Sequence, residues 1–231
     1  MTTAGTGRPA VEGLRERKKR TTRRQLSDTA TRMFLERGFD AVRVADVGEA
    51  CGVSEKTVFN YFPSKEALLL DRLEATADAL RTHLPDPALT PVSAMLTILD
   101  HELDGLATAL AADDDQDRAL AQYQKFGDLI RSTPSLRAYQ SDTADRFVDI
   151  AAEVLATRTG LRPDDPEPQI AAATLLGMWR VQFRALRTHV RPGHPLSDAI
   201  DAVAREVRRA ARLAEAGLAT FPAPANHADH D

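Results

Sequence analysis

Apolar residues recur at helical spacing along most of the chain. Between residues 23 and 37, for example, Leu26, Ala30 and Met33 fall on one face of a helix, which Gly38 would end. No segment shows alternation of apolar and polar residues over the length of a strand. The pattern therefore predicts an all-α fold of about nine helices.

Turn and capping signals separate the predicted helices. Thr90-Pro91 and Thr133-Pro134 each place a capping residue before a proline that suits the first helical turn. Pro85 and Pro87 end another helix. The predicted helices cover residues 23–37, two short segments on either side of Gly52, and residues 65 to about 83, 91–111, 116–131, 134–159, 167–190 and 196–216.

The two short helical patterns flank Gly52-Val53-Ser54. Gly52 can adopt the positive φ that closes the first helix, and Ser54 can cap the second. Apolar residues four positions apart, such as Val58 and Phe62, let each helix bury one face. The sequence therefore predicts a helix-turn-helix, whose second helix is offered to the major groove of DNA.

Many residues between 24 and 68 agree with one known pattern at fixed spacing: Arg24, Leu26, Ala30, Phe34, Gly38-Phe39, Gly52-Val53-Ser54, Thr57-Val58-Phe59-Asn60-Tyr61-Phe62 and Ser64-Lys65-Glu66-Ala67-Leu68. With these residues the chain resembles the N-terminal domain of the tetracycline repressor (TetR) family of bacterial transcription regulators. The match covers about a fifth of the chain. The resemblance implies a DNA-binding head followed by a helical body that binds an effector and dimerises.

Sequence reading is predicted for the second short helix, which Ser54 opens. Asn60 can make a two-point contact with adenine, and Lys56 can reach guanine. Glu55 can accept a hydrogen bond from cytosine, and Thr57 can touch a thymine methyl group. Any of these side chains could instead simply face solvent.

The resemblance adds contacts to the DNA backbone. By position in the family pattern, Tyr61 and Lys65 match residues that grip phosphates, and such contacts fix register rather than sequence. The chain has Phe59 where the family usually has Tyr, so a hydroxyl contact is missing. It has Arg43-Val44 where many relatives carry a Thr that contacts the backbone, and Arg43 is expected to supply that contact instead.

The N-terminal extension is rich in basic residues and poor in apolar ones, which predicts disorder. It is either a solvated charged tail or a basic arm that touches DNA, and Thr22-x-x-Gln25 resembles a capping box that opens the next helix. The basic residues are Arg15, Arg17, Lys18, Lys19 and Arg20. The predicted organisation is a disordered arm over 1–20, a DNA-binding domain over 21–68, an effector-binding and dimerisation domain over 69–216, and a disordered tail over 217–231.

The charge of the chain supports this division. The net charge of the 231 residues is −4, but residues up to Arg72 include 14 basic and 10 acidic side chains, and the remainder has 16 and 24. Attraction to phosphate depends on the local potential, which is screened over about 10 Å. A single cysteine excludes an internal disulfide framework, and no signal peptide or spanning segment is visible. We therefore expect a soluble bacterial protein of the cytoplasm, associated with the nucleoid.

A ligand cavity in the body would be lined by apolar and aromatic side chains with few polar groups. An effector would be mostly apolar, and an anionic end could meet Arg180 and Arg184, although a solvated basic stripe is the alternative. Each lining residue could also be an ordinary core residue. The expected pocket residues are Leu103, Tyr123, Phe126, Phe147, Met178, Trp179 and Phe183.

The last two predicted helices carry apolar residues at helical spacing. Two such hairpins from two subunits would form a four-helix bundle, which is the family's usual dimer interface. The stripes could also pack only within the chain. The residues expected at a homodimer interface are Ile170, Gly177, Val181, Ile200, Val203 and Val207.

No catalytic or metal-binding motif is found: there is no Gly-rich phosphate loop, no H-E-x-x-H, no G-x-S-x-G and no Cys/His cluster. We therefore expect no enzyme activity, no cofactor and no metal. The leading hypothesis is a dimeric repressor that a small, mostly apolar effector of unknown identity releases from a palindromic operator in double-stranded DNA. The alternative is an architectural DNA binder or corepressor without small-molecule input.

Overall fold

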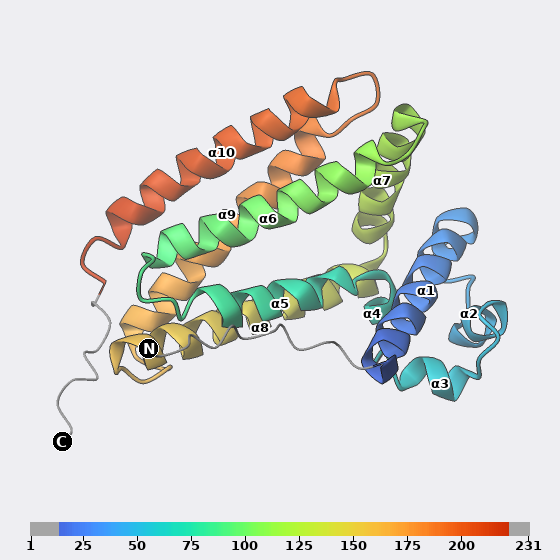
Figure 1. Ribbon diagram of the computed structural model, residues 1–231, viewed down its shortest axis with the longest axis horizontal. Coiled ribbons are helices and arrows are strands. Elements are labelled where there is room, and N and C mark those ends of the chain that lie inside the picture. The colour runs from blue at the N-terminus through green and yellow to red at the C-terminus, as the bar shows by residue number, and fades with distance from the viewer. Residues whose placement is uncertain (1–13, 222–231) are drawn as a thin grey trace, which may run out of the picture. The chain divides into compact units, whose positions relative to one another are not determined.

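The computed structural model describes residues 14–221, and every regular element in that range is an α-helix (Figure 1). The predicted all-α class is confirmed. The chain divides into two compact units, Met1–Asp71 and Arg72–Asp231. The helices are α1 (Leu14–Arg37), α2 (Val44–Ala50), α3 (Glu55–Phe59), α4 (Lys65–Leu69), α5 (Arg72–His83), α6 (Pro91–Ala111), α7 (Gln116–Ser132), α8 (Pro134–Thr159), α9 (Pro166–His189) and α10 (Leu196–Gly217).

The first unit is built around α1, which packs against α2 and α4, while α3 packs against α2. Its aromatic core includes Phe34 and Phe39, whose ring centroids are 4.9 Å apart. The apolar side chains Val58 and Phe62, which were predicted to face inward, are buried. Residues with at most 1% exposure in this core are Leu26, Ala30, Phe34, Val42, Val47, Val58, Phe62 and Leu68.

Helix α1 begins at Leu14 rather than at Arg23, so the predicted disorder of residues 14–20 is wrong. The Thr22 hydroxyl therefore does not open a helix. Arg, Lys and Glu have high helix propensity, and a helix already fixed by its packed part extends at the cost of ordering one residue per hydrogen bond. Residues 1–13, which carry the rest of the predicted arm, lie outside the described residues.

The predicted helix over residues 65–83 is divided into α4 and α5, which raises the number of described helices from about nine to ten. Leu70, at φ −102° and ψ 22°, leaves helical geometry. The end of α4 is held by α1, because the Ser27 hydroxyl donates to the Leu68 carbonyl at 2.9 Å and Arg23 pairs with Asp71 at 2.6 Å. Contacts with another helix thus end α4, although the local sequence favours continuation.

The second unit contains α5 to α10. Helix α9 packs against α8 and α10, α6 contacts α5, α9 and α10, and α7 packs against α6 and α8. The Thr90 hydroxyl accepts a hydrogen bond from the Ser93 amide at 3.0 Å, as the Thr90-Pro91 signal predicted. Thr133 makes no such side-chain cap. Helix α10 ends at Gly217, and residues 222–231 of the predicted tail lie outside the described residues.

No helix in residues 14–221 is both long and apolar enough to cross a membrane.

Candidate functional site

The turn between α2 and α3 has the geometry that the sequence predicts. Gly52 adopts φ +70°, in the left-handed region that glycine enters at little cost. The Ser54 side chain caps α3 by accepting a hydrogen bond from the Thr57 amide at 3.1 Å. Val53, between Gly52 and Ser54, is bound to α2, since its amide donates to the Gly48 carbonyl at 2.9 Å. The turn therefore fixes the start of α3 relative to α2.

Helix α3 presents the predicted DNA readers on its outer side. Glu55, Lys56 and Asn60 are exposed, and Thr57 is half-buried, with its hydroxyl 2.8 Å from that of Ser54. Val58 on the opposite side is fully buried. The helix ends at Phe59, so Asn60 stands at its C-cap rather than inside it. Polar groups on a short, capped helix are thus available to base edges, and their base contacts stay predictions.

Arg43 lies before α2 and already has an acidic partner. Its amide donates to Asp46 Oδ2 at 2.9 Å, and its guanidinium donates to Asp46 Oδ1 at 2.7 Å. These hydrogen bonds from Arg43 hold the pKa of Asp46 below its usual range. The Arg43 side chain is 79% exposed. Its contact with a phosphate stays a prediction, and Asp46 would share its charge in such a contact.

Lys65 and Tyr61, the residues expected to grip phosphates, are both half-buried. The Lys65 ammonium lies over the Phe39 ring, with Nζ 4.3 Å from the ring centroid. Ser64 caps α4 by accepting a hydrogen bond from the Ala67 amide at 3.2 Å. Cation–π contact holds the Lys65 side chain against the core, which restricts where its charge can meet DNA.

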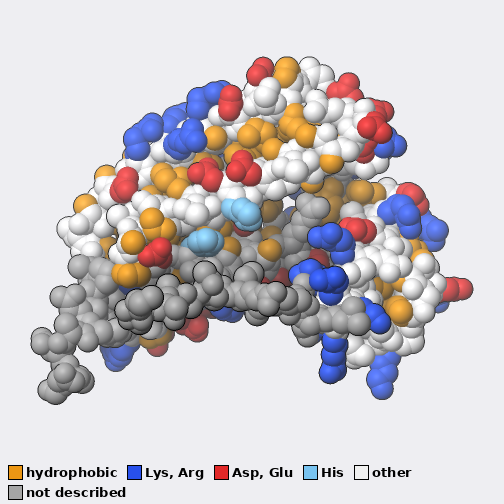
Figure 2. Space-filling model, in the orientation of Figure 1, with side chains coloured by type: hydrophobic (Ala, Val, Ile, Leu, Met, Phe, Trp, Pro, Cys, Tyr) orange, Lys and Arg blue, Asp and Glu red, His pale blue; other side chains and the backbone are white. Residues whose placement is uncertain are grey.

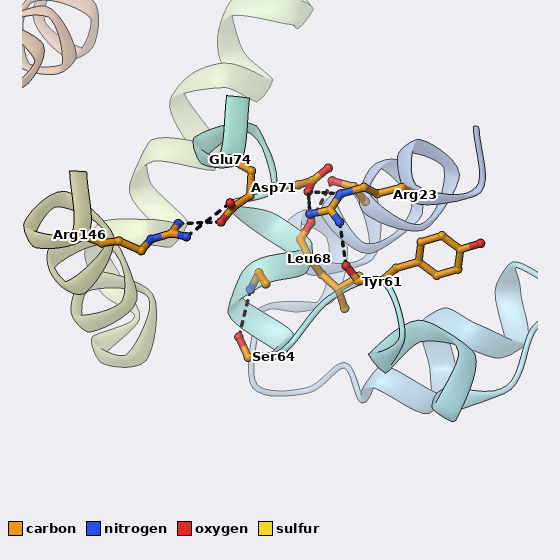
Figure 3. Close-up of polar contacts among 9 residues, drawn as sticks. Arg23, Tyr61, Ser64, Leu68, Asp71, Glu74 and Arg146 are labelled. Atoms are coloured by element: carbon orange, nitrogen blue, oxygen red, sulfur yellow. Dashed lines mark hydrogen bonds and ion pairs between the residues drawn. The ribbon is translucent and has the colours of Figure 1, made fainter. Parts of the chain in front are cut away.

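Arg23 is a central residue of this site that sequence reasoning missed. Its Nε donates to Asp71 Oδ1 at 2.7 Å and its Nη1 donates to the Tyr61 carbonyl at 2.8 Å (Figure 3). The guanidinium carbon also lies 4.7 Å from the centroid of the Phe62 ring. One side chain on α1 therefore fixes the segment that follows α3. The partners are 38 and 48 residues away in sequence, so no local pattern could reveal them.

We expect Arg23→Ala to lower the free energy of unfolding of the first unit by about 1.5–3 kcal/mol, the range for hydrogen bonds to charged groups. The change leaves Asp71, whose side chain is 19% exposed, without its cation. Denaturant unfolding would measure the loss. Arg24→Ala is the matched control, because Arg24 is the exposed neighbour on the same helix. Equal stability of the two variants would contradict a stabilising role for Arg23.

The predicted pocket residues lie in the second unit, and the structure brings three of them together. The rings of Phe147 and Trp179 meet edge to face at 5.6 Å, and Phe183 lies 4.5 Å from Trp179 on its own helix. Leu103 and Met178 are buried. The two predicted residues on α7 are half-buried: Tyr123 and Phe126.

The predicted dimer residues are divided between the surface and the core. Ile170 is 65% exposed, Gly177 is exposed, and Val181 and Ile200 are half-buried. The prediction that Val203 and Val207 face a second subunit is wrong, because they are 0% and 2% exposed within the single chain. Their helix is strongly amphipathic, and its apolar stripe packs against α9 and α6 of the same subunit.

Comparison with known proteins shows the family. The family model for bacterial regulatory proteins of the tetR family matches residues 26–71, and the model for the MftR C-terminal domain matches residues 104–212. The transcriptional regulator MftR of Mycobacterium tuberculosis is 30% identical over 166 residues, which cover 70% of this chain and 78% of MftR. The chain belongs to the TetR family of bacterial regulatory proteins. The family predicted from residues 24–68 is thus confirmed, and α1 to α4 of this TetR-family regulator carry its DNA-binding helix-turn-helix.

Two further comparisons agree. The transcriptional regulator TcmR of Streptomyces glaucescens is 29% identical over 187 residues, covering 76% of this chain and 77% of TcmR. The structure of SmeT in complex with triclosan superimposes with a TM-score of 0.51 at 18% identity, covering 85% of this chain and 91% of SmeT. The first supports a transcriptional regulator, and the second supports the all-α fold.

Proposed function

We propose that this TetR-family regulator is a homodimeric repressor that binds a palindromic operator and is released by a small, mostly apolar effector. The observation that carries the proposal is the capped helix α3, with Glu55 and Lys56 exposed on the helix and Asn60 exposed at its C-cap. A dimer can place two such helices in successive major grooves only when they are about 34–36 Å apart. An effector that binds better to a conformation with another spacing lowers the affinity for DNA by linkage.

The exposed faces of α9 and α10 support a homodimer. Large apolar side chains are open to solvent there, with Ile170 65% and Leu213 77% exposed. A shallow hollow of about 500 Å³ lies between the two helices, and basic side chains gather over α10 (Figure 2). Its lining residues are Val181, Glu206, Arg209, Ala210, Arg212 and Leu213.

The charge pattern of α10 favours an antiparallel partner. Its exposed side carries Asp198 and Asp201 near its start, then Arg205, Arg208, Arg209 and Arg212, and Glu215 near its end. In a two-fold arrangement with antiparallel α10 helices, the acidic start of one copy can face the basic stretch of the other. Such charge complementarity favours the antiparallel orientation of the two helices over the parallel one.

Asn60→Ala tests the assignment of sequence reading. We expect a loss of about 1–3 kcal/mol in binding free energy on the operator and a smaller loss on random DNA, because a base contact disappears. Lys65→Ala is expected to weaken both alike, because a phosphate contact carries no sequence information. Fluorescence anisotropy with both duplexes gives the ratio of the affinity for the operator to the affinity for random DNA. An unchanged ratio for Asn60→Ala would overturn the role of Asn60.

Leu213→Glu tests the interface. It places an unpaired charge in the proposed apolar contact, where the expected cost is about 3–5 kcal/mol, but leaves the core of the subunit intact. We expect folded monomers with weak operator affinity in sedimentation and binding measurements. Ala138→Glu adds the same charge at an exposed position of α8 and is expected to remain dimeric. A wild-type monomer at micromolar concentration, or a fully dimeric Leu213→Glu, would contradict the proposal.

A further inference from the structure

A largely buried polar cluster lies inside the second unit, beside the Phe147–Trp179 contact described above. Thr76 of α5 is 3% exposed, and its hydroxyl donates to Glu102 Oε1 of α6 at 2.5 Å. The indole nitrogen of Trp179 of α9 is directed toward the same carboxyl group. Three helices thus contribute one polar group each, and the Phe147 ring lies next to the cluster, at 5.6 Å from the Trp179 ring.

The Trp179 indole nitrogen is the unusual member of this cluster. Trp179 is 3% exposed, and its Nε1–H makes no hydrogen bond, although it lies close enough to the Glu102 carboxyl to affect its pKa. A buried donor without a partner costs free energy, and nearly all buried donors in folded proteins are paired. Within the described residues, no other buried side-chain nitrogen or oxygen lacks a partner. The free N–H therefore offers a binding position for an acceptor.

Burial raises the pKa of the Glu102 carboxyl, while the Thr76 hydroxyl and the Trp179 N–H oppose this rise. A negative charge is thus disfavoured at Glu102 compared with a surface glutamate. A second negative charge brought next to it would be disfavoured further, because two like charges in a poorly solvated region repel strongly.

The pair of groups restricts what can bind between them. The Trp179 N–H requires a hydrogen-bond acceptor. The Glu102 carboxyl, when it is ionised, requires a hydrogen-bond donor. An ammonium group provides only donors and leaves the indole unpaired, and a carboxylate provides only acceptors and meets the Glu102 charge. A hydroxyl group provides both an acceptor and a donor.

We propose that Trp179 Nε1 and the Glu102 carboxyl anchor the hydroxyl group of an apolar phenol or alcohol, whose hydrocarbon part packs against Phe147. This inference rests on the proposed effector-responsive function and names the chemical class of the effector. The Phe183 ring lies 4.5 Å from Trp179 and is 37% exposed. Arg180 and Arg184 are exposed on α9, so the anionic end expected from the sequence finds no partner at this anchor.

Three probes of equal hydrocarbon size test the anchor on the full-length dimer: para-butylphenol, butylbenzene and para-butylbenzoate. Calorimetry gives each dissociation constant, and quenching of Trp179, the only tryptophan, confirms the location. We expect para-butylphenol to bind about tenfold more tightly than butylbenzene, the value of one well-formed hydrogen bond. Para-butylbenzoate is expected to bind most weakly.

Two variants separate the anchor from general hydrophobic binding. Trp179→Phe removes the N–H and keeps an aromatic ring, and is expected to weaken para-butylphenol about two- to tenfold while leaving butylbenzene unchanged. Glu102→Gln is expected to strengthen para-butylbenzoate by reducing charge repulsion. Asp104→Asn is the matched control, because it removes an exposed carboxylate from the same helix. It is expected to change none of the three affinities.

The proposal is overturned if butylbenzene binds as tightly as para-butylphenol, if Trp179→Phe weakens both alike, or if none of the probes binds. Failure of the proposed function has a different signature. If para-butylphenol binds with the expected variant pattern but leaves operator affinity unchanged, the anchor stands and the effector-responsive role falls. If the protein binds no palindromic duplex, the repressor role falls independently of the three dissociation constants.

Discussion

Val203→Glu is expected to unfold the second unit instead of separating two folded subunits. The Val203 side chain is fully buried within one subunit, where α10 packs against α9 and α6. An unpaired carboxylate there has no cation and little water, and its burial costs several kcal/mol. Whole domains are stabilised by only about 5–15 kcal/mol, so this single change removes a large part of the free energy of unfolding.

Circular dichroism and sedimentation distinguish the two outcomes. Val203→Glu is expected to lose helical signal at a lower temperature and to aggregate, while Leu213→Glu keeps its helical signal as a monomer. The two substitutions introduce the same charge on the same helix, at positions with 0% and 77% exposure. A Val203→Glu protein that is folded and monomeric would show that this face of α10 is open in the free subunit.

Phe62→Ala is expected to have the second large effect, on the DNA-binding unit alone. Phe62 is 1% exposed, and the guanidinium carbon of Arg23 lies over its ring, 4.7 Å from the ring centroid. Truncation of a buried phenylalanine costs about 3–5 kcal/mol, because a cavity remains. A unit as small as α1 to α4 has little stability to lose, so operator binding should disappear.

Phe59→Ala is the matched control, since Phe59 is three residues earlier and 46% exposed. Its truncation is expected to change the stability by less than about 0.5 kcal/mol. The second unit has its own core, so the helical signal of Phe62→Ala should fall only partly. A single cooperative loss of both units would show that they do not fold independently.

The sequence predicted those features that local physical chemistry determines. Thr90-Pro91 and Thr133-Pro134 placed the starts of α6 and α8 at the correct residues, and Gly52 with Ser54 specified the turn. These signals act over one helical turn, so they can be read along the chain. The turn at Gly52 and Ser54 also lies among residues 24–68, from which the family was recognised.

Features that depend on distant partners could not be predicted in this way. The periodicity of α10 showed an apolar stripe but not what covers it, so Val203 was assigned to a second subunit. The break between α4 and α5 depends on Arg23 and Ser27, more than forty residues earlier. Likewise, Thr76 and Glu102 are separated by 26 residues, and neither stands in a recognisable motif.

The guanidinium of Arg23 also connects the end of the first unit to the segment that follows α3. Asp71, the last residue of the first unit, is joined by one peptide bond to Arg72, where α5 begins. The same planar group holds the Asp71 carboxylate and the Tyr61 carbonyl. Displacement of Asp71 is therefore expected to shift Tyr61, the residue after Asn60, as well.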